Sequence, residues 1–297
     1  MKKESEFAWN EYSALERVGI RSAENAFRND ARLDEQWEQL RFHERPDFEE
    51  AVREYQMFRD RLVASGATLI ELPDHDKLTL DSIYTRDNII VSPEGLILCN
   101  MGRASRTAEG PLNAAEYEQH GFTVLGHIKY PGTLEGGDFI WLDAKTAAVA
   151  LGPRTNRDGI EQLHDLLGRD VDLHVVPLPS PDHPDHPDDV LHLMSIISPL
   201  DQNLAVIYRP MMPTAFINWL EAKGMGFVEV PQAEFLPMGC NVLALAPRRV
   251  LMLENLPETK SRLEAAGCTV LTYKGLEISR KGEGGPTCLT RPLLRAL

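Results

Sequence analysis

The stretch Phe139-Ile140-Trp141-Leu142, followed after a short polar turn by Ala147-Ala148-Val149-Ala150-Leu151, has the form of a β-hairpin. Residues 157–167 come next and carry the apolar spacing of a helix, and residues 173–177 read as a further strand. This order of strand, turn, strand, helix and strand decides the fold, because it recurs along the chain.

The repeat extends in both directions from this stretch. Similar units cover residues 88–125, 195–230 and 242–273, and a helix at 47–64 with a strand at 68–72 forms a degenerate fifth copy. In the second of these we expect a first strand at 195–197 and a helix at 214–222, and in the third a last strand at 269–273. An irregular amphipathic segment over residues 1–45 precedes them. Five units that each bury a face against their neighbours can close into a ring, which predicts a ring of α/β modules. Chance alternation of strands and helices in an ordinary α/β domain is the alternative.

Composition limits the classes of partner. The 297 residues are 43% hydrophobic, enough for one large core, so we expect a single domain over residues 1–297. Lysine plus arginine total 31 against 45 acidic residues, a formal charge of −14 without a basic stripe. Nucleic acid and anionic membranes are therefore unfavourable partners, and a small cation is favourable. Without an apolar leader or a run long enough to span a membrane, we expect a soluble, cytoplasmic protein.

One of the four cysteines stands apart. Cys99, Cys240 and Cys268 lie in or beside apolar strands, and the four lack the spacing of a zinc site or a disulfide scaffold. Cys288 instead follows the glycine-rich turn Gly282-Glu283-Gly284-Gly285-Pro286-Thr287. Glycines allow a backbone to approach a ligand closely, so this thiol is a candidate nucleophile at the mouth of a pocket.

Several groups could assist such a thiol. His192, between two leucines, is a candidate acid or base, although a core histidine is the alternative. Glu135 and Asp138 flank a diglycine at the entry to a strand and could grip a planar cation. Asp81 and Asp87 add two acids, with a turn or cap role as the alternative. A cysteine, an imidazole and surplus carboxylates suit attack on a carbon that carries positive charge, such as that of a guanidinium.

The loop at residues 181–189 has two histidines beside aspartates and could be mistaken for a metal-binding tract. Prolines at every third position prevent a regular element from fixing ligand geometry there. We therefore expect a solvated lid in preference to a metal site.

In order and spacing, the candidate motifs resemble those of the guanidino-group-modifying, or pentein, superfamily of arginine deiminases, amidinotransferases and dimethylarginine dimethylaminohydrolases. The resemblance is strongest to the last of these. The motifs are Asp81-Ser82-Ile83-Tyr84-Thr85-Arg86-Asp87, Ala104-Ser105-Arg106, Thr133-Leu134-Glu135-Gly136-Gly137-Asp138, Arg154-Thr155-Asn156, His192-Leu193 and Cys288. The resemblance implies a five-bladed α/β propeller with pseudo-fivefold symmetry, built from ββαβ units.

The resemblance also implies roles for these residues. Cys288 would be the nucleophile, His192 the general acid and base, and Glu135 a carboxylate near both guanidinium and imidazole. The substrate would be held by Asp87 at its guanidinium, by Arg106 and Arg154 at its carboxylate, and by Asp81 at its α-amino end. The family's mechanism passes through a covalent amidino-thioether and needs no metal or organic cofactor.

One departure from the pattern bears on the substrate. Arginine deiminases carry an aspartate two residues after the histidine, where this chain has Met194. Loss of that acid favours a substituted guanidine, whereas Thr85-Arg86-Asp87 is more similar to the deiminase version. The leading hypothesis is a hydrolase that converts methylated arginine to citrulline and an alkylamine.

Other functions stay open at this point. An arginine deiminase or an amidinotransferase would use the same covalent half-reaction. A catalytically silent guanidine-binding protein would keep the fold, and a metal-dependent amidine hydrolase would need acid and histidine clusters that are absent outside residues 181–189. The sequence also leaves a homo-oligomer open.

Overall fold

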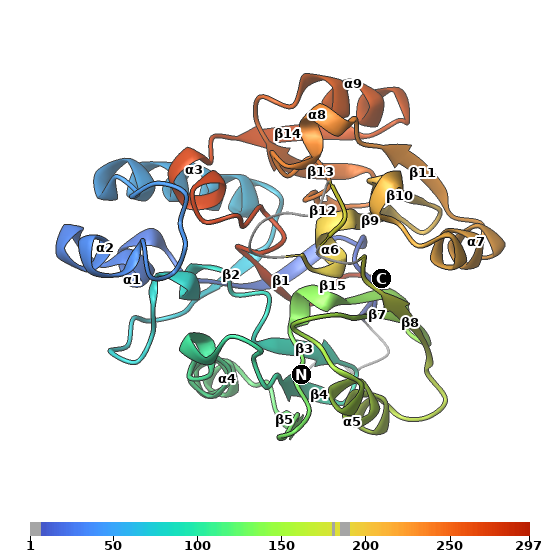
Figure 1. Cartoon of the computed structure of the whole chain (residues 1–297), viewed down its shortest axis with the longest axis horizontal. Helices are drawn as coiled ribbons and strands as arrows, with labels where there is room; N and C mark the ends of the chain where they lie inside the picture. The colour runs from blue at the N-terminus through green and yellow to red at the C-terminus, as the bar shows by residue number, and fades with distance from the viewer. Residues whose placement is uncertain (1–6, 180–181, 185–190) are drawn as a thin grey trace.

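The computed structural model describes residues 7–179, 182–184 and 191–297. In these residues the strands form five three-stranded sheets arranged around a common centre, with the longer helices on the outside (Figure 1). The sheets, in spatial order of their strands, are β15 (Arg291–Arg295), β1 (Leu15–Ile20) and β2 (Thr68–Glu71); β3 (Ile89–Ser92), β4 (Gly95–Leu98) and β5 (Val124–His127); β6 (Phe139–Asp143), β7 (Thr146–Leu151) and β8 (Asp172–Pro177); β9 (Ile197–Asp201), β10 (Leu204–Ile207) and β11 (Gly226–Glu229); and β12 (Leu243–Ala246), β13 (Arg249–Leu253) and β14 (Thr269–Tyr273).

Each sheet has the same internal pattern. Its central strand pairs antiparallel with one neighbour and parallel with the other; β7, for example, is antiparallel to β6 and parallel to β8. A parallel pair needs a crossover, and a helix supplies it in every unit. These crossover helices are α3 (Phe48–Ala64), α4 (Glu109–Gln119), α5 (Arg157–Leu167), α7 (Thr214–Ala222) and α9 (Pro257–Ala265). The predicted five-bladed α/β fold built from ββαβ units is confirmed.

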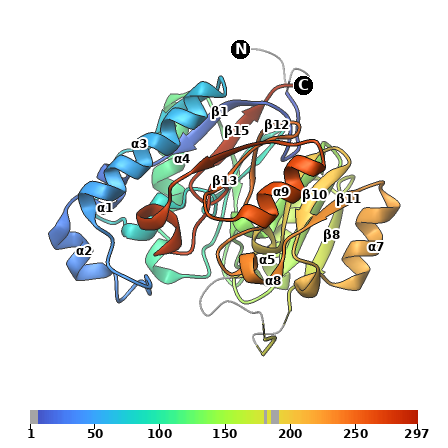
Figure 2. The same cartoon turned by 90° about the horizontal axis from the view of Figure 1, so that it is seen from above.

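Local sequence explains why these elements form where they do. Helix α5 begins after Asn156, whose side chain accepts a hydrogen bond from the Gly159 N–H at 2.8 Å, and it buries Ile160 and Leu163. Strand β7 is apolar nearly throughout because it is covered on both faces. Figure 2 shows α3 and α7 on opposite flanks of the molecule, so the helices surround the sheets.

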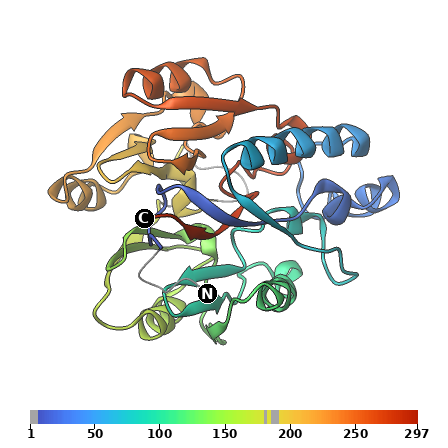
Figure 3. The same cartoon turned by 180° about the vertical axis from the view of Figure 1, so that it is seen from behind.

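The first sheet joins two distant parts of the chain. β1 and β15 pair antiparallel, with Gly19 opposite Arg291. They lie side by side in the view from behind (Figure 3). The segment expected to be irregular thus contains β1 and the short helices α1 (Ala23–Phe27) and α2 (Asp30–Gln36). Neither β1 nor β15 was predicted, because each finds its partner only in three dimensions.

Two further differences concern connections between the blades. Ser195 and Ile196, expected to begin a strand, lie in the helical turn α6 (Leu193–Ile196) instead, and the strand starts at Ile197. The predicted lid at 181–189 lies largely outside the described residues. In the parts of the chain that the structure describes, no helix is long and apolar enough to cross a membrane.

Candidate active site

The candidate site lies where the segments entering the five sheets meet at the centre of the ring. Each segment places one polar side chain there, shortly before the first strand of a blade. These side chains are Asp87 before β3, Glu135 before β6, His192 before β9, Asn241 before β12 and Cys288 before β15. The pseudo-fivefold fold therefore gathers five groups that are far apart in sequence.

Cys288 is the partly accessible cysteine, whereas Cys99, Cys240 and Cys268 are buried. Asn241 Nδ2 donates a hydrogen bond to its sulfur at 3.3 Å. Burial raises the pKa of the Cys288 thiol and the charge of Asp87 raises it further, while the hydrogen bond from Asn241 acts in the opposite direction. The cysteine is therefore a thiol at neutral pH until a positive charge arrives beside it.

Asn241 is a site residue that the sequence reasoning missed. Its Oδ1 accepts hydrogen bonds from the backbone N–H of Thr287 at 2.9 Å and from the Thr287 hydroxyl at 2.8 Å. With Nδ2 on the sulfur, the amide holds the nucleophile segment at three points. Its place before β12, equivalent to that of Asp87 before β3, is the signal in the repeat that could have revealed it.

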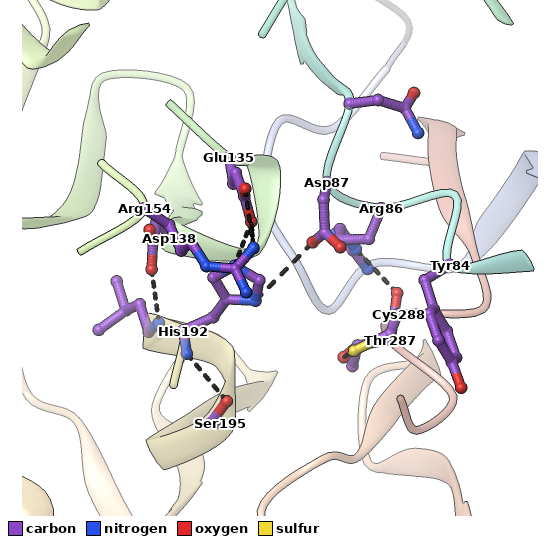
Figure 4. Close-up of polar contacts among 12 residues, drawn as sticks. Tyr84, Arg86, Asp87, Glu135, Asp138, Arg154, His192, Ser195, Thr287 and Cys288 are labelled. Atoms are coloured by element: carbon purple, nitrogen blue, oxygen red, sulfur yellow. Dashed lines mark hydrogen bonds and ion pairs between the residues drawn. The ribbon is translucent and has the colours of Figure 1, made fainter. Parts of the chain in front are cut away.

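His192 lies between two carboxylates (Figure 4). Its Nε2 is 2.8 Å from Glu135 Oε2 and its Nδ1 is 3.9 Å from Asp87 Oδ1. Burial by itself would lower the pKa of His192, but the charges of Asp138, Asp87 and Glu135 outweigh it and raise the pKa to about 9. The imidazole is therefore protonated at neutral pH, as a general acid must be.

Glu135 is fully buried and ionised. Burial opposes its charge, but the hydrogen bond to His192 and the positive charges of His192, Arg154 and Arg106 lower its pKa to about 2. Its Oε1 also accepts from the backbone N–H of Gly102 at 3.0 Å and from Arg154 Nη1 at 3.1 Å. Both of its oxygens are therefore engaged, and Oε2 holds the protonated imidazole of His192 in place.

Asp87 has one oxygen that accepts a hydrogen bond and one that, among the described residues, has no hydrogen-bond donor. Oδ2 accepts a hydrogen bond from Arg106 Nη1 at 2.7 Å. Oδ1 is buried and, among the described residues, has no hydrogen-bond donor. It faces His192 Nδ1 in the cavity that Cys288 also lines. A carboxylate oxygen held in this way can accept an N–H from a ligand.

Gly137 lets Asp87 and His192 come together. A Cβ atom on Gly137 would lie 2.7 Å from Asp87 Oδ1 and 2.7 Å from His192 Nδ1, closer than nonbonded atoms approach. The diglycine before β6 thus serves close packing between the two side chains.

Both predicted arginines line the polar cavity. Arg106 is buried, and its guanidinium already donates to both oxygens of Glu109, to Asp87 and to the Tyr84 carbonyl. Arg154 lies beside Glu135, 3.1 Å from its Oε1. Arg103, which the sequence reasoning missed, lines the cavity too and lies 2.9 Å from Asp81 Oδ2.

Asp138 and Met194 take other places. Asp138 is fully buried; it accepts hydrogen bonds from the Thr155 hydroxyl at 2.7 Å and from the Leu193 N–H at 3.1 Å. Burial raises its pKa to about 6. Met194 lines a separate small cavity with Ser198 and Arg86, whereas Ser195 lines the cavity at Cys288. The structure therefore places Asp138 against the segment that begins with His192, and Met194 lines a cavity other than the two at Cys288.

Two cavities meet at the nucleophile, and both are lined by His192, Cys288 and Glu283. The narrower one, about 40 Å³, is polar and contains Asp81, Asp87, Arg103 and Arg154. The larger one, about 290 Å³, has one apolar wall, formed by residues 235–238, and polar side chains around the rest. Among the described residues, no cluster of His, Cys, Asp and Glu is suited to a metal ion.

Comparison with known sequences gives concordant results. An arginine deiminase of Mycobacterium marinum is 29% identical over 246 residues, which are 72% of this chain and 60% of the deiminase. The chain therefore spans less than two thirds of the length of such deiminases. An uncharacterized protein of Aeropyrum pernix is 26% identical over 252 residues, covering 84% of this chain and 86% of that protein.

Solved structures share the fold. The dimethylarginine dimethylaminohydrolase from Pseudomonas aeruginosa, solved as a cysteine-to-serine mutant complexed with citrulline, superposes with a TM-score of 0.73 at 21% identity, covering 95% of this chain and 99% of that chain. The N-terminal domain of ArgZ, an arginine dihydrolase from cyanobacteria, superposes with a TM-score of 0.76 at 18% identity, covering 94% and 97%.

A family model links the chain to one branch of this fold. The model described as "N,N dimethylarginine dimethylhydrolase, eukaryotic" matches residues 21–295, which include all five central side chains. The match covers nearly the whole of the five-bladed ring. The chain therefore belongs to the N,N dimethylarginine dimethylhydrolase family of the pentein superfamily.

Proposed function

We propose that the protein is a hydrolase that cleaves a C–N bond of a substituted guanidine, with methylated arginine as the substrate and citrulline and an alkylamine as the products. One observation carries the proposal: the buried Oδ1 of Asp87 has no donor among the described residues and faces the cavity at Cys288. A buried carboxylate oxygen without a donor is costly, and a guanidinium N–H supplies both the donor and the countercharge.

Substrate binding also prepares the nucleophile. The negative charge of Asp87 is one cause of the raised pKa of Cys288. A guanidinium beside both groups offsets that charge and favours the thiolate. His192 is already protonated, so the thiol proton passes to solvent.

The first half-reaction then uses both groups. The Cys288 thiolate forms a bond to the guanidinium carbon, and the bond from that carbon to the substituted nitrogen breaks. The departing amine takes the proton of His192, and the amidino group stays on sulfur as a thioether. Glu135, 2.8 Å from Nε2, keeps the imidazole in position for this transfer.

The second half-reaction restores the enzyme. Neutral His192 accepts a proton from water as the water oxygen attacks the amidino carbon. The C–S bond breaks and a ureido product leaves. In sum, one guanidinium and one water give one urea and one ammonium ion.

The polar cavity suits the amino-acid end of arginine. Arg103 and Arg154 can hold a carboxylate and Asp81 an ammonium group. Arg103 already forms an ion pair with Asp81, and Arg154 forms one with Glu135. Both guanidinium groups are therefore oriented before a ligand binds.

The test is to incubate the purified protein with arginine, monomethylarginine and asymmetric dimethylarginine, without an added amine and with a strong chelator present. We expect citrulline from the methylated substrates at higher kcat/KM than from arginine, and none from Cys288→Ser. Arginine as the best substrate would indicate a deiminase, and citrulline release only with an added amine would indicate an amidinotransferase. No citrulline from any of them would reject the proposal.

A further inference from the structure

The larger cavity at Cys288 is larger than a methyl group needs. Its volume, about 290 Å³, lies at the lower end of the range of small-molecule pockets. Phe235, Leu236, Pro237 and Met238 form one wall, and the rest comes mainly from polar residues around the nucleophile. A site for a methyl or dimethyl substituent would leave most of this space unused.

The apolar wall is rigidly built. Phe235 ends the helical turn α8 (Gln232–Phe235) and stacks on Tyr208 with ring centroids 3.9 Å apart. The turn that follows is closed by hydrogen bonds from the Met238 N–H to the Phe235 carbonyl and from the Gly239 N–H to the Glu234 carbonyl, both at 2.8 Å. Met238 has φ of 70°, a conformation that a side-chain-bearing residue seldom adopts. Such strain at the edge of a cavity is common in functional segments.

Leu236 lies beside the cavity with 63% of its surface exposed. A large apolar side chain left in water next to a pocket is the kind of surface that an apolar ligand covers. Leu236 therefore marks the mouth of the cavity.

The charged side chains that line the larger cavity, His43, Arg280 and Glu283, each contact another protein group. His43 Nε2 is 2.7 Å from Glu283 Oε1, and Arg280 donates to the Glu254 carbonyl at 2.9 Å. The charges that match an amino acid, those of Asp81, Arg103 and Arg154, line the narrow cavity instead. The two cavities therefore divide a substrate into a zwitterionic part and an apolar part, with the guanidinium between them at Cys288.

Given the proposed function, we propose that the larger cavity takes an apolar substituent of about four carbons, carried by the nitrogen that departs. The step is the one already described: the C–S bond forms, the bond to the substituted nitrogen breaks, and the alkylamine leaves with the proton of His192. The alkyl group lies against residues 235–238 throughout, and the exposed mouth lets the amine escape. The substrate class is thus a longer N-alkyl guanidine of an amino acid.

The experiment compares kcat/KM for Nω-methyl-, Nω-butyl- and Nω-(4-aminobutyl)-L-arginine by release of citrulline. Each buried methylene favours binding by about fourfold, so the butyl substrate should exceed the methyl one by roughly tenfold or more. The aminobutyl compound has the same length but ends in a charge. It is included because Glu283 Oε2 has no hydrogen-bond partner among the described residues and could attract an ammonium group.

The variant Leu236→Asp isolates the apolar wall. It should reduce kcat/KM about tenfold more for the butyl substrate than for the methyl substrate, and an unchanged melting temperature shows that the variant is folded. The matched control is Leu297→Asp, because Leu297 is 82% exposed and does not line the cavity. It should leave both substrates unchanged.

The outcomes separate this inference from the proposed function. Turnover of the methyl substrate without preference for butyl overturns the inference alone, as does a preference for aminobutyl. N-butylcitrulline with ammonia would mean that the substituted nitrogen stays, and overturns it too. Absence of Cys288-dependent citrulline from all three substrates overturns the proposed function itself.

Discussion

At the scale of single residues, the site depends on an imidazole that stays charged although it is buried. His192 is about 5% exposed, and burial alone would favour its neutral form. The surrounding carboxylates reverse that preference. The free protein therefore holds a protonated imidazole and an unionised thiol in one cavity, which is the starting state of the proposed reaction.

Glu135→Gln tests that account. We expect the pKa of His192 to fall by about one unit or more, because a charged acceptor becomes neutral. Protonated His192 is the active form, so the alkaline limb of the kcat/KM profile, near pH 9 in the unmodified protein, should move to lower pH. A pH–rate profile and an NMR titration of the His192 ring measure this shift. Glu161→Gln, on the exposed part of α5, is the control; an unmoved alkaline limb in folded Glu135→Gln contradicts the account.

Site residues could be predicted from the sequence where they belong to a recognisable motif. They could not be predicted where their role depends only on contacts made in the folded protein. Asp87, Glu135, His192 and Cys288 stand beside glycines or in recognisable strings, and the structure brings them together. Asn241 has no motif, because its role comes from Thr287 and Cys288 in another blade. Arg103 likewise could be identified only from its position in the lining of the polar cavity.

At the scale of elements, the turn before β6 sets the distance between acid and anchor. Gly136 and Gly137 form a 3₁₀ turn with Asp138, and Gly137 fills the narrow space beside Asp87 and His192. The backbone itself forms part of the wall there. A side chain at this position would have to displace one of the two groups.

Gly137→Ala should therefore lower kcat/KM by about a hundredfold, the cost of displacing a catalytic group by about 1 Å. The melting temperature should change by only a few degrees, because the rest of the turn is kept. Gly226→Ala is the matched control, since a Cβ there has its nearest neighbour at an ordinary 3.5 Å. Full activity in Gly137→Ala would refute the positioning role.

Elements that are stabilised locally were predicted well, and elements that depend on distant partners were not. Helices α5 and α7 and strand β14 match their predicted residues closely, because capping, apolar spacing and β-branched composition are local. β1 carries the charged pair Glu16 and Arg17 at partly buried positions, and β15 begins and ends with a buried arginine, so neither reads as a strand alone. Turn α6 was read as a strand because its apolar residues continue those of β9.

At the scale of the whole molecule, a buried charge cluster joins the first blade to the site. Glu11, ahead of β1, lies 3.1 Å from Arg86, and Arg86 donates to the Thr287 carbonyl at 3.0 Å. Burial opposes the charge of Glu11, but Arg86, Arg291 and Arg295 outweigh it and lower its pKa. The Glu11 carboxylate thus offsets the positive charges of Arg86 and of two arginines of β15, Arg291 and Arg295.

Glu11→Ala should reduce the free energy of unfolding by about 3–5 kcal/mol, because Arg86 would keep a buried charge without its partner. The pKa of Glu11 is lower in the folded protein than in the unfolded one. Its contribution is therefore present above the unfolded pKa, near 4.5, and is lost as the pH falls through the folded value. Urea denaturation at pH 7 measures the difference, with exposed Glu38→Ala as the control. Equal stability of the two variants would contradict a structural role for the pair.

The pairing of β1 with β15 has a consequence for biosynthesis. The ribosome delivers β1 early and β15 late, so four blades can emerge while the first still lacks its edge strand β15. Cys288, just ahead of β15, is the last of the five central side chains to leave the exit tunnel. The nascent polypeptide therefore carries Asp87 for most of its translation, and His192 for about the last third, without Cys288, and the five central side chains come together only when the late strand docks on the early one.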